Sequence, residues 1–275
     1  MSVIDETTAG IKLRRTVRRP GSGAHLWRER LLGIASPVVL LILWEIAARA
    51  GLVDARFFPA PSSIGRSMLT MMKSGELENN TWATLHRLLL GFVAGGLPGL
   101  ALGILMGVYR PIRLAIEPLI AATYPIPKSA ILPLILLIFG LGEPSKIVMV
   151  AIGAFYPIAI NTTAGVREIN SIYFDVGKNF GAGRWNTFRT IALPGALPFI
   201  MTGAKLGAGL SLILIAIAEM MGAKKGLGYM IWSAWETFDV EQMYVGLFVI
   251  ALIGFLITIV FDELERRIIP WKSTK

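Results

Sequence analysis

The 275-residue sequence contains no cysteine and only two histidines, His25 and His86. Without cysteine the chain has no disulfide framework, no thiolate zinc site and no thiol nucleophile. A His-Glu-x-x-His motif is absent, and no combination of serine, histidine and aspartate suggests a catalytic triad. We therefore expect no catalytic residue and no metal site, which argues against the common hydrolase and metalloenzyme classes.

A phosphate-binding loop is also missing. The nearest approximation is Gly177-Lys178, which is followed by Asn179 and lacks the upstream glycine of the Gly-x-x-x-x-Gly-Lys-Ser/Thr pattern. The chain is therefore not expected to bind and hydrolyse ATP in the P-loop manner by itself. No cofactor held by this chain is expected either.

Charged residues are scarce, at 16% of the chain, whereas apolar residues make up 54%, and the mean hydropathy is +0.63. This composition is too hydrophobic for an ordinary soluble domain. The net charge of +9 could suggest nucleic-acid binding, but the basic residues lie in short loops and tails that flank apolar runs. That distribution is typical of membrane proteins, so we expect a bilayer-embedded chain and no nucleic-acid partner.

Six apolar runs are long enough to cross a bilayer, which takes about 20 residues. They cover residues 31–50, 88–108, 118–139, 147–164, 199–221 and 243–261. The first run continues into Trp44-Glu45 and Arg49 without a small-residue cleavage site, so we expect a retained span and not a signal peptide. The sequence therefore predicts an all-α polytopic membrane protein with six transmembrane helices.

The orientation of these spans follows from the basic residues. If the N-terminus is inside, the cytoplasmic segments hold 17 of the 27 Lys and Arg residues. This bias places both termini in the cytoplasm. The predicted organisation is a basic cytoplasmic tail at 1–30, a transmembrane domain at 31–268 with a cytoplasmic loop at 165–195, and a second cytoplasmic tail at 269–275.

Two spans carry unusual residues. The second run contains five glycines at four-residue spacing: Gly91, Gly95, Gly99, Gly103 and Gly107. Glycine allows close backbone approach between helices in lipid, so this row predicts a tight helix crossing, either within one subunit or with a second copy. The alternative reading is that the span flexes around Pro98.

The third run is interrupted by Pro125, Pro127 and Pro133, with Lys128 among them. Proline removes a backbone donor and clashes with the preceding turn, so this helix is predicted to be broken or kinked. A break in lipid is tolerated where it faces protein or water. A lysine at that depth then either serves a transport pathway, or snorkels toward the membrane surface, or pairs structurally with an acidic neighbour. The candidate translocation pathway comprises Tyr124, Lys128, Lys205 and Glu219.

A polar, basic stretch at 175–194 separates the fourth and fifth runs. A short helix is predicted at 172–179, and Gly181 is expected to end it in the left-handed conformation that glycine adopts without strain. A second short helix is predicted at 184–192, and Leu193-Pro194 is expected to end it. A helical hairpin outside the membrane is suited to bind a partner there.

The spacing within this stretch resembles the cytoplasmic EAA loop of ABC importer permeases. Gly181 is followed by nine residues, then by Ile191, one further residue and Leu193-Pro194, which match the family pattern in full. Asp175-Val176-Gly177 stands at the EAA triplet, so the acidic position is kept and both alanines are replaced. The resemblance implies that an ATPase subunit binds this loop. The implied coupling residues are Asp175, Gly177, Gly181, Arg184, Phe188, Ile191, Leu193 and Pro194.

Similarity to these permeases extends over almost the whole chain, through segments 133–146, 193–205 and 218–229. The C-terminal Ile269-Pro270-Trp271 is similar to taurine permeases in particular. The chain is identified as a member of the nitrate/sulfonate/taurine branch of ABC importer permeases. This resemblance implies the type I, MetI-like permease fold.

The resemblance also implies partners and a substrate class. It implies a homodimer, two ABC ATPase subunits that bind the ATP, a periplasmic or lipid-anchored substrate-binding protein, and a location in the bacterial inner membrane. The implied substrate is a small anion of the sulfonate, taurine, nitrate or bicarbonate type, with pyrimidine precursors as a neutral alternative. The alternative function is an ion-gradient-driven secondary transporter or channel, which requires intramembrane acids that carry protons or sodium.

Overall fold

The computed structural model describes residues 23–270, and the described residues form helices without any strand. The chain divides into two compact units, one up to Ala55 and one from Arg56 onward. In the first unit, helix α1 (Gly23–Arg49) contains the first predicted span and begins inside the region predicted as a tail. Near its end, Arg49 pairs with Glu45 one turn earlier at 2.5 Å. Most of both predicted tails lies outside the described residues.

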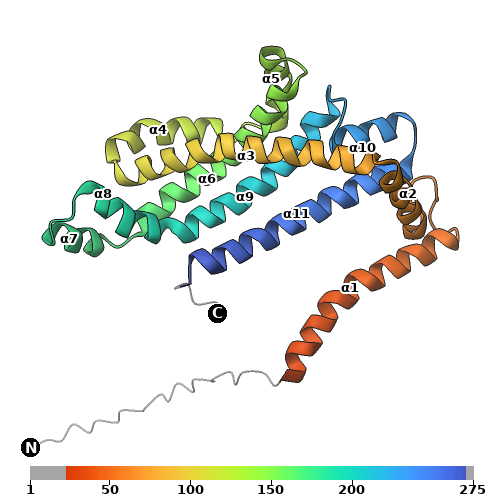
Figure 1. The fold of residues 1–275 in the computed structure, drawn as a ribbon, viewed down its shortest axis with the longest axis horizontal. Helices are drawn as coiled ribbons and strands as arrows, with labels where there is room; N and C mark the ends of the chain where they lie inside the picture. The colour runs from red at the N-terminus through yellow and green to blue at the C-terminus, as the bar shows by residue number, and fades with distance from the viewer. Residues whose placement is uncertain (1–22, 271–275) are drawn as a thin grey trace, which may run out of the picture. The chain divides into compact units, whose positions relative to one another are not determined.

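The second unit contains the remaining helices. Their bounds are α2 (Pro61–Ser74), α3 (Glu76–Val108), α4 (Arg110–Thr123), η1 (Lys128–Ile131), α5 (Leu132–Phe139), α6 (Glu143–Glu168), α7 (Ser171–Asn179), α8 (Arg184–Thr187), η2 (Phe188–Ala192), α9 (Leu193–Met220), α10 (Leu227–Glu236) and α11 (Val240–Ile268). In Figure 1, α3, α6, α9 and α11 run side by side, with α7 and α8 at one end and α2 and α10 at the other.

Four helices within the described residues are long and apolar enough to cross a membrane: α3, α6, α11 and the continuous helical stretch Trp185–Met220. The pair formed by α4 and the segment Lys128–Phe139 passes the same test as one broken span, bent by 87°. The predicted break in the third run is therefore confirmed, and it occurs where the prolines remove backbone donors.

The glycine row of α3 packs against α6. A Cβ added at Gly95 would lie 2.0 Å from the carbonyl oxygen of Ala151, and one added at Gly99 would lie 2.7 Å from that of Phe155. At Gly91 and Gly107 the nearest atoms belong to Val150 and Val166 of the same helix. The predicted close helix crossing is confirmed, and the row forms it within one subunit.

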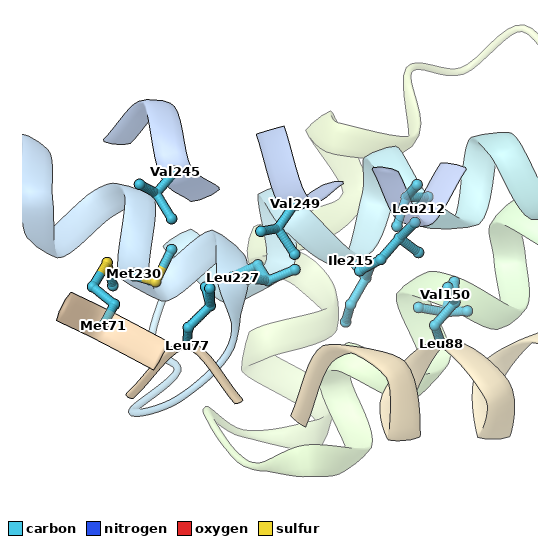
Figure 2. Packing of buried hydrophobic residues seen from close by; sticks show 11 residues of the cluster. Met71, Leu77, Leu88, Val150, Leu212, Ile215, Leu227, Met230, Val245 and Val249 are labelled. Carbon is cyan, nitrogen blue, oxygen red and sulfur yellow. The ribbon is translucent and has the colours of Figure 1, made fainter. Parts of the chain in front are cut away.

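Besides the contact between α3 and α6, the core contains a cluster of buried apolar side chains toward the end that carries α2 and α10. Figure 2 shows buried side chains from six helices that meet there, and it labels Met71, Leu77, Leu88, Val150, Leu212, Ile215, Leu227, Met230, Val245 and Val249. The short helices α2 and α10 thus bury apolar faces against α3, α9 and α11. Apolar side chains of the long helices elsewhere remain exposed, as expected for surfaces that face lipid or other chains.

Candidate functional site

The coupling loop, residues 165–195, is held by local hydrogen bonds at both ends of α7. The Asn170 side chain accepts a hydrogen bond from the backbone N–H of Ile172 at 3.0 Å, which caps the start of the helix. At the other end Gly181 has φ +69°, and the next backbone N–H, of Ala182, donates to the carbonyl of Gly177 at 2.9 Å. This is the Schellman arrangement, and the predicted left-handed conformation of Gly181 is confirmed.

The two helices of the loop touch at Gly177. A Cβ added there would lie 3.0 Å from Cδ1 of Ile191 and 3.8 Å from Cβ of Ala182. Because the nearer atom is the end of a flexible side chain, the alanine found here in the EAA pattern would need only a small adjustment. Asp175-Val176-Gly177 thus lies close to the second helix, and this position does not require glycine.

The second helix of the loop does not end at Leu193-Pro194, so that prediction is wrong. Helix α8, which begins at Arg184, continues through the π-helical turn η2 into α9. The backbone N–H of Leu193 donates to the carbonyl of Phe188, five residues back. This wider turn shifts the hydrogen-bond register just before Pro194, which fits the first turn of α9 because it has no N–H to donate. The loop is thus joined to a membrane span without a break.

The coupling loop exposes several large apolar side chains. Phe180 in the turn is 88% exposed and Trp185 is 69% exposed, and Tyr173 and Val176 of α7 are also exposed. The rings of Trp185 and Phe188 lie 5.4 Å apart. Asp175 is exposed too and lies 3.7 Å from Lys178. Aromatic side chains in a charged rim are typical of a protein-binding surface.

Lys128 lies at the break between α4 and α5. Its ammonium donates to the carbonyl oxygens of Thr123, at 2.8 Å, and Tyr124, at 3.1 Å. It also lies 4.3 Å from the ring centre of Tyr156 and 5.8 Å from that of Tyr124. Among the described residues it forms no ion pair. The predicted alternative, a structural pair with an acidic neighbour, therefore receives no support from the described part of the chain.

A pocket of about 200 Å³ opens beside Lys128. It is lined by Tyr124, Lys128 and Ser129 at the break, by Ile152, Gly153, Tyr156 and Pro157 of α6, and by Leu210, Ile213, Leu214 and Ile217 of α9. The break thus faces two other spans across a small cavity. Of the four predicted pathway residues, the pocket brings together Tyr124 and Lys128.

Lys205 and Glu219 lie elsewhere. The Lys205 ammonium pairs with Asp262 at 2.6 Å and with Glu265, both on α11. It lines a separate cavity of about 40 Å³. Glu219 is 0% exposed and lies near the end of α9 that is remote from the coupling loop. Neither residue lines the pocket beside Lys128.

Glu219 is the centre of an outer polar cluster, which also contains Thr84, Arg87, Glu143 and Gly228. Its carboxylate accepts hydrogen bonds from the Thr84 hydroxyl at 2.9 Å, from the Arg87 guanidinium at 2.8 Å and from the Gly228 backbone N–H at 2.9 Å. Arg87 also binds Glu143 through two parallel contacts of 2.6 Å. The cluster thus joins α3, α6, α9 and α10.

The same cluster caps the start of α10. The backbone N–H groups of Gly226 and Leu227 donate to Asn80 and Thr84 of α3, each at 2.8 Å. Gly226 has φ +126°, and a Cβ there would lie 2.3 Å from the Glu219 carboxyl carbon. Side chains of α3 and α9 therefore satisfy donors that the first turn of a helix leaves open. Thr84, Arg87 and Glu143 were not predicted as site residues; their only signal in the sequence is an arginine in an apolar run.

Comparisons with known proteins agree with this architecture. Residues 99–273 match the family described as binding-protein-dependent transport system inner membrane component. The chain is 34% identical over 251 residues to the taurine transport system permease protein TauC of Escherichia coli (strain K12), which covers 90% of this chain and 91% of that protein. It is 31% identical over 257 residues to the putative aliphatic sulfonates transport permease protein SsuC of Bacillus subtilis (strain 168), covering 94% and 92%.

A third relative is the nitrate import permease protein NrtB of Synechocystis sp. (strain ATCC 27184 / PCC 6803 / Kazusa), at 29% identity over 274 residues, covering 96% of this chain and 98% of that protein. The fold is similar to that of a chain in inward-facing MetNI methionine ABC transporter structures, with a TM-score of 0.62 over 72% of this chain and 97% of that chain at 22% identity. The chain therefore belongs to the binding-protein-dependent transport system inner membrane components, the permeases of ABC importers, and has the MetI-like type I permease fold.

Proposed function

We propose that this chain is the transmembrane subunit through which a small anion of the sulfonate, taurine, nitrate or bicarbonate type enters the cytoplasm. A partner ATPase supplies the energy by binding and hydrolysing ATP. Each chain docks one ATPase subunit through the coupling loop, with Asp175, Gly181 and Phe188 at or near the contact. The names of the relatives, which include permeases for taurine, aliphatic sulfonates and nitrate, support this substrate class.

The observation that carries the proposal is the construction of the coupling loop. It is capped at both ends of α7, it exposes aromatic side chains, and it continues into α9 through η2. A partner that moves this loop therefore moves a membrane span with it, because a helix without a break transmits displacement along its axis. Such a connection is what coupling between ATP hydrolysis and transport requires.

Further partners follow from the family. Six spans are too few to enclose a transport path easily, so two copies of this chain are proposed to form it together. A periplasmic or lipid-anchored binding protein delivers the substrate at the outer face, and the complex lies in the bacterial inner membrane. The outer polar cluster and α10 lie at the end opposite the coupling loop, which is the side where such a protein would bind.

The alternative, a secondary transporter driven by an ion gradient, has little support. It would need an intramembrane acid that is free to load and release a proton or a sodium ion. Glu219 is engaged by three donors from two helices, and Asp262 and Glu265 share Lys205. The comparisons also name ABC permeases and no secondary transporter.

The coupling role can be tested at Gly181. Gly181→Val places a β-branched residue at φ +69°, which should cost about 1 kcal/mol or more of local strain and misalign α8. We expect normal membrane insertion, weaker association with the ATPase subunit and lower substrate-stimulated ATPase activity. The measurement is co-purification of the ATPase together with ATP hydrolysis in reconstituted vesicles.

Gly183→Val is the matched control for this variant. Gly183 belongs to the same turn, and like Gly181 it has no neighbour within 4 Å of an added Cβ, but its φ is not positive. We expect this control to retain most of the ATPase association. Normal transport by Gly181→Val at normal expression would contradict the proposed role of the loop.

The proposed orientation can be tested with single cysteines, since the chain has none of its own. A cysteine at Ser2 or Thr274, which lie outside the described residues, should resist a membrane-impermeant thiol reagent in intact cells. A cysteine at Ser74, which is exposed at the end of α2, should react. Labelling of both termini from outside would reverse the orientation.

A further inference from the structure

We propose that the pocket beside Lys128 binds the substrate during transport and that its chemistry favours a short aliphatic sulfonate over taurine and over nitrate. In this site the oxoanion lies at Lys128 and the hydrocarbon chain lies against α6 and α9. The inference rests on the proposed function, because it assumes that a small anion crosses this subunit. It adds the site, the orientation of the ligand and a preference among the anions.

The position of the pocket along the spans supports a ligand site. Tyr156, whose ring lies 4.3 Å from the Lys128 ammonium, is close to the middle of α6, which runs from Glu143 to Glu168. The α9 residues of the pocket lie between Leu210 and Ile217, in the half of that helix nearer Met220. The pocket is therefore near the middle of one span, beside the second half of another and next to a discontinuous third one. A broken helix at this depth exposes polar backbone, which lipid does not tolerate but a water-filled or ligand-filled cavity does.

The charge of Lys128 favours an anionic ligand. Two of its three N–H groups donate to the carbonyls of Thr123 and Tyr124, and the nearby tyrosine rings attract the ammonium. All of these partners are neutral, and no acidic residue lines the pocket. A cation this deep retains an uncompensated charge, which an anionic ligand can offset. Since the carbonyls and rings already stabilise the ammonium, binding should be moderate, as release into the cytoplasm requires.

The pocket lining also offers further hydrogen-bond donors. Ser129 and Tyr124 line the pocket, and their hydroxyl groups form no hydrogen bond with any residue that the structure describes. The Tyr156 hydroxyl is already used, since it donates to Thr123 Oγ1 at 3.0 Å. One ammonium and two hydroxyl groups match the three oxygen atoms of a sulfonate group.

The rest of the pocket wall is apolar. Ile152, Leu210, Ile213, Leu214 and Ile217 supply hydrocarbon and no polar side chain. The cavity of about 200 Å³ is large enough for a head group and a short chain. Nitrate would leave this wall uncovered. Taurine would direct its ammonium group toward it without a carboxylate to pair with.

The lack of native cysteine allows a direct binding test that does not depend on the selectivity of the binding protein. A single cysteine replaces Ile213, which is exposed on the pocket wall, in membrane vesicles from cells that express the permease with its ATPase. The rate of labelling by a neutral maleimide is then measured against increasing butanesulfonate, taurine or nitrate. We expect protection at the lowest concentration by butanesulfonate, and none by butanol.

Variants of Lys128 separate ligand binding from a structural role. Lys128→Met on the Ile213→Cys background should raise the half-protecting concentration of butanesulfonate by about tenfold, the effect expected for loss of one charge-assisted contact. Lys128→Arg should retain most of the protection. If Lys128 only caps α4, Lys128→Met and Lys128→Arg on the Ile213→Cys background would have the same labelling rate at every butanesulfonate concentration. A cysteine at Ser74, remote from the pocket, is the labelling control and should not be protected.

Three outcomes would overturn the inference: no protection by butanesulfonate, equal protection by all three anions, or protection that follows the content of anionic lipid and not the added sulfonate. The last outcome would assign the site to a lipid head group. Failure of the proposed function is a separate result. In that case the complete transporter would show no ATP-driven anion uptake, whereas protection of Ile213→Cys by butanesulfonate could still be measured.

Discussion

Gly95→Ala is expected to disrupt the membrane domain, although it adds a single methyl group. The added Cβ would lie 2.0 Å from the carbonyl oxygen of Ala151 and 2.6 Å from the Cα of that residue. Both atoms are backbone, so no side chain can rotate away and α3 must move off α6 along the whole glycine row. Overpacking of this kind typically costs about 1–3 kcal/mol, and a backbone obstacle places this case at or above the upper end. The measurement is the amount of folded permease in the membrane and its thermal stability in detergent.

Gly209→Ala is the matched control for this change. Gly209 also lies within a membrane helix, α9, but no described heavy atom lies within 4 Å of an added Cβ. Alanine in an unobstructed helix position is favoured over glycine by roughly 0.5–1 kcal/mol, so this variant should be neutral or slightly stabilised. If both variants were equally stable, the glycine row would not be the close contact that holds α3 against α6.

Glu219→Ala is expected to have the second large effect, because it leaves buried donors without an acceptor. The substitution removes the partner of the Thr84 hydroxyl and the Gly228 N–H, and one of the two carboxylates bound by Arg87. Removal of one member of a buried charge pair typically costs about 3–5 kcal/mol. Since the cluster also caps α10, we expect lower thermal stability together with proteolytic cleavage in residues 221–226. Thermal unfolding and limited proteolysis from the outer face measure the two effects.

Glu143→Ala is the control for charge alone. Glu143 also binds Arg87, but its side chain is 59% exposed, so water can replace it and the loss should be much smaller. The double variant Arg87→Met/Glu219→Met should be less destabilised than the sum of its single changes, since the two groups interact directly. A Glu219→Ala variant that is as stable as Glu143→Ala would show that the buried pair contributes little.

Several features of the fold could be predicted because their causes are local in the sequence. Pro125 and Pro127 stand two residues apart and remove two backbone donors from one turn, so the interruption around Lys128 could be predicted from this short segment. Gly181 follows a short helix, and glycine is the residue that adopts the left-handed conformation there without strain. The coupling loop could also be located from the sequence, because its signal is a fixed spacing of residues within one segment.

Other features depend on contacts between distant segments and could not be predicted. The continuation of α8 into α9 was not predicted, because Pro194 suggests a helix end. The π-helical turn before it shifts the hydrogen-bond register, so that Pro194 stands in the first turn of α9, where its missing N–H leaves no carbonyl unpaired. The partners of Glu219 lie on two other helices, and Thr84 is 135 residues away. No periodicity in a single helix indicates which buried polar groups will meet.

The sequence by itself determined that this chain is a polytopic helical membrane protein, where its third span breaks, and where a short helical hairpin precedes the fifth span. These properties arise from hydrophobic length, proline chemistry and motif spacing, all of which act within one segment. Only the tertiary structure decided that the glycine row packs against α6, that Glu219 and Arg87 join the helix ends remote from the coupling loop, and that Lys128 faces a pocket with no acidic residue among its described lining. The physical reason is that close packing and charge compensation are properties of pairs of segments, and the sequence does not state which pairs form.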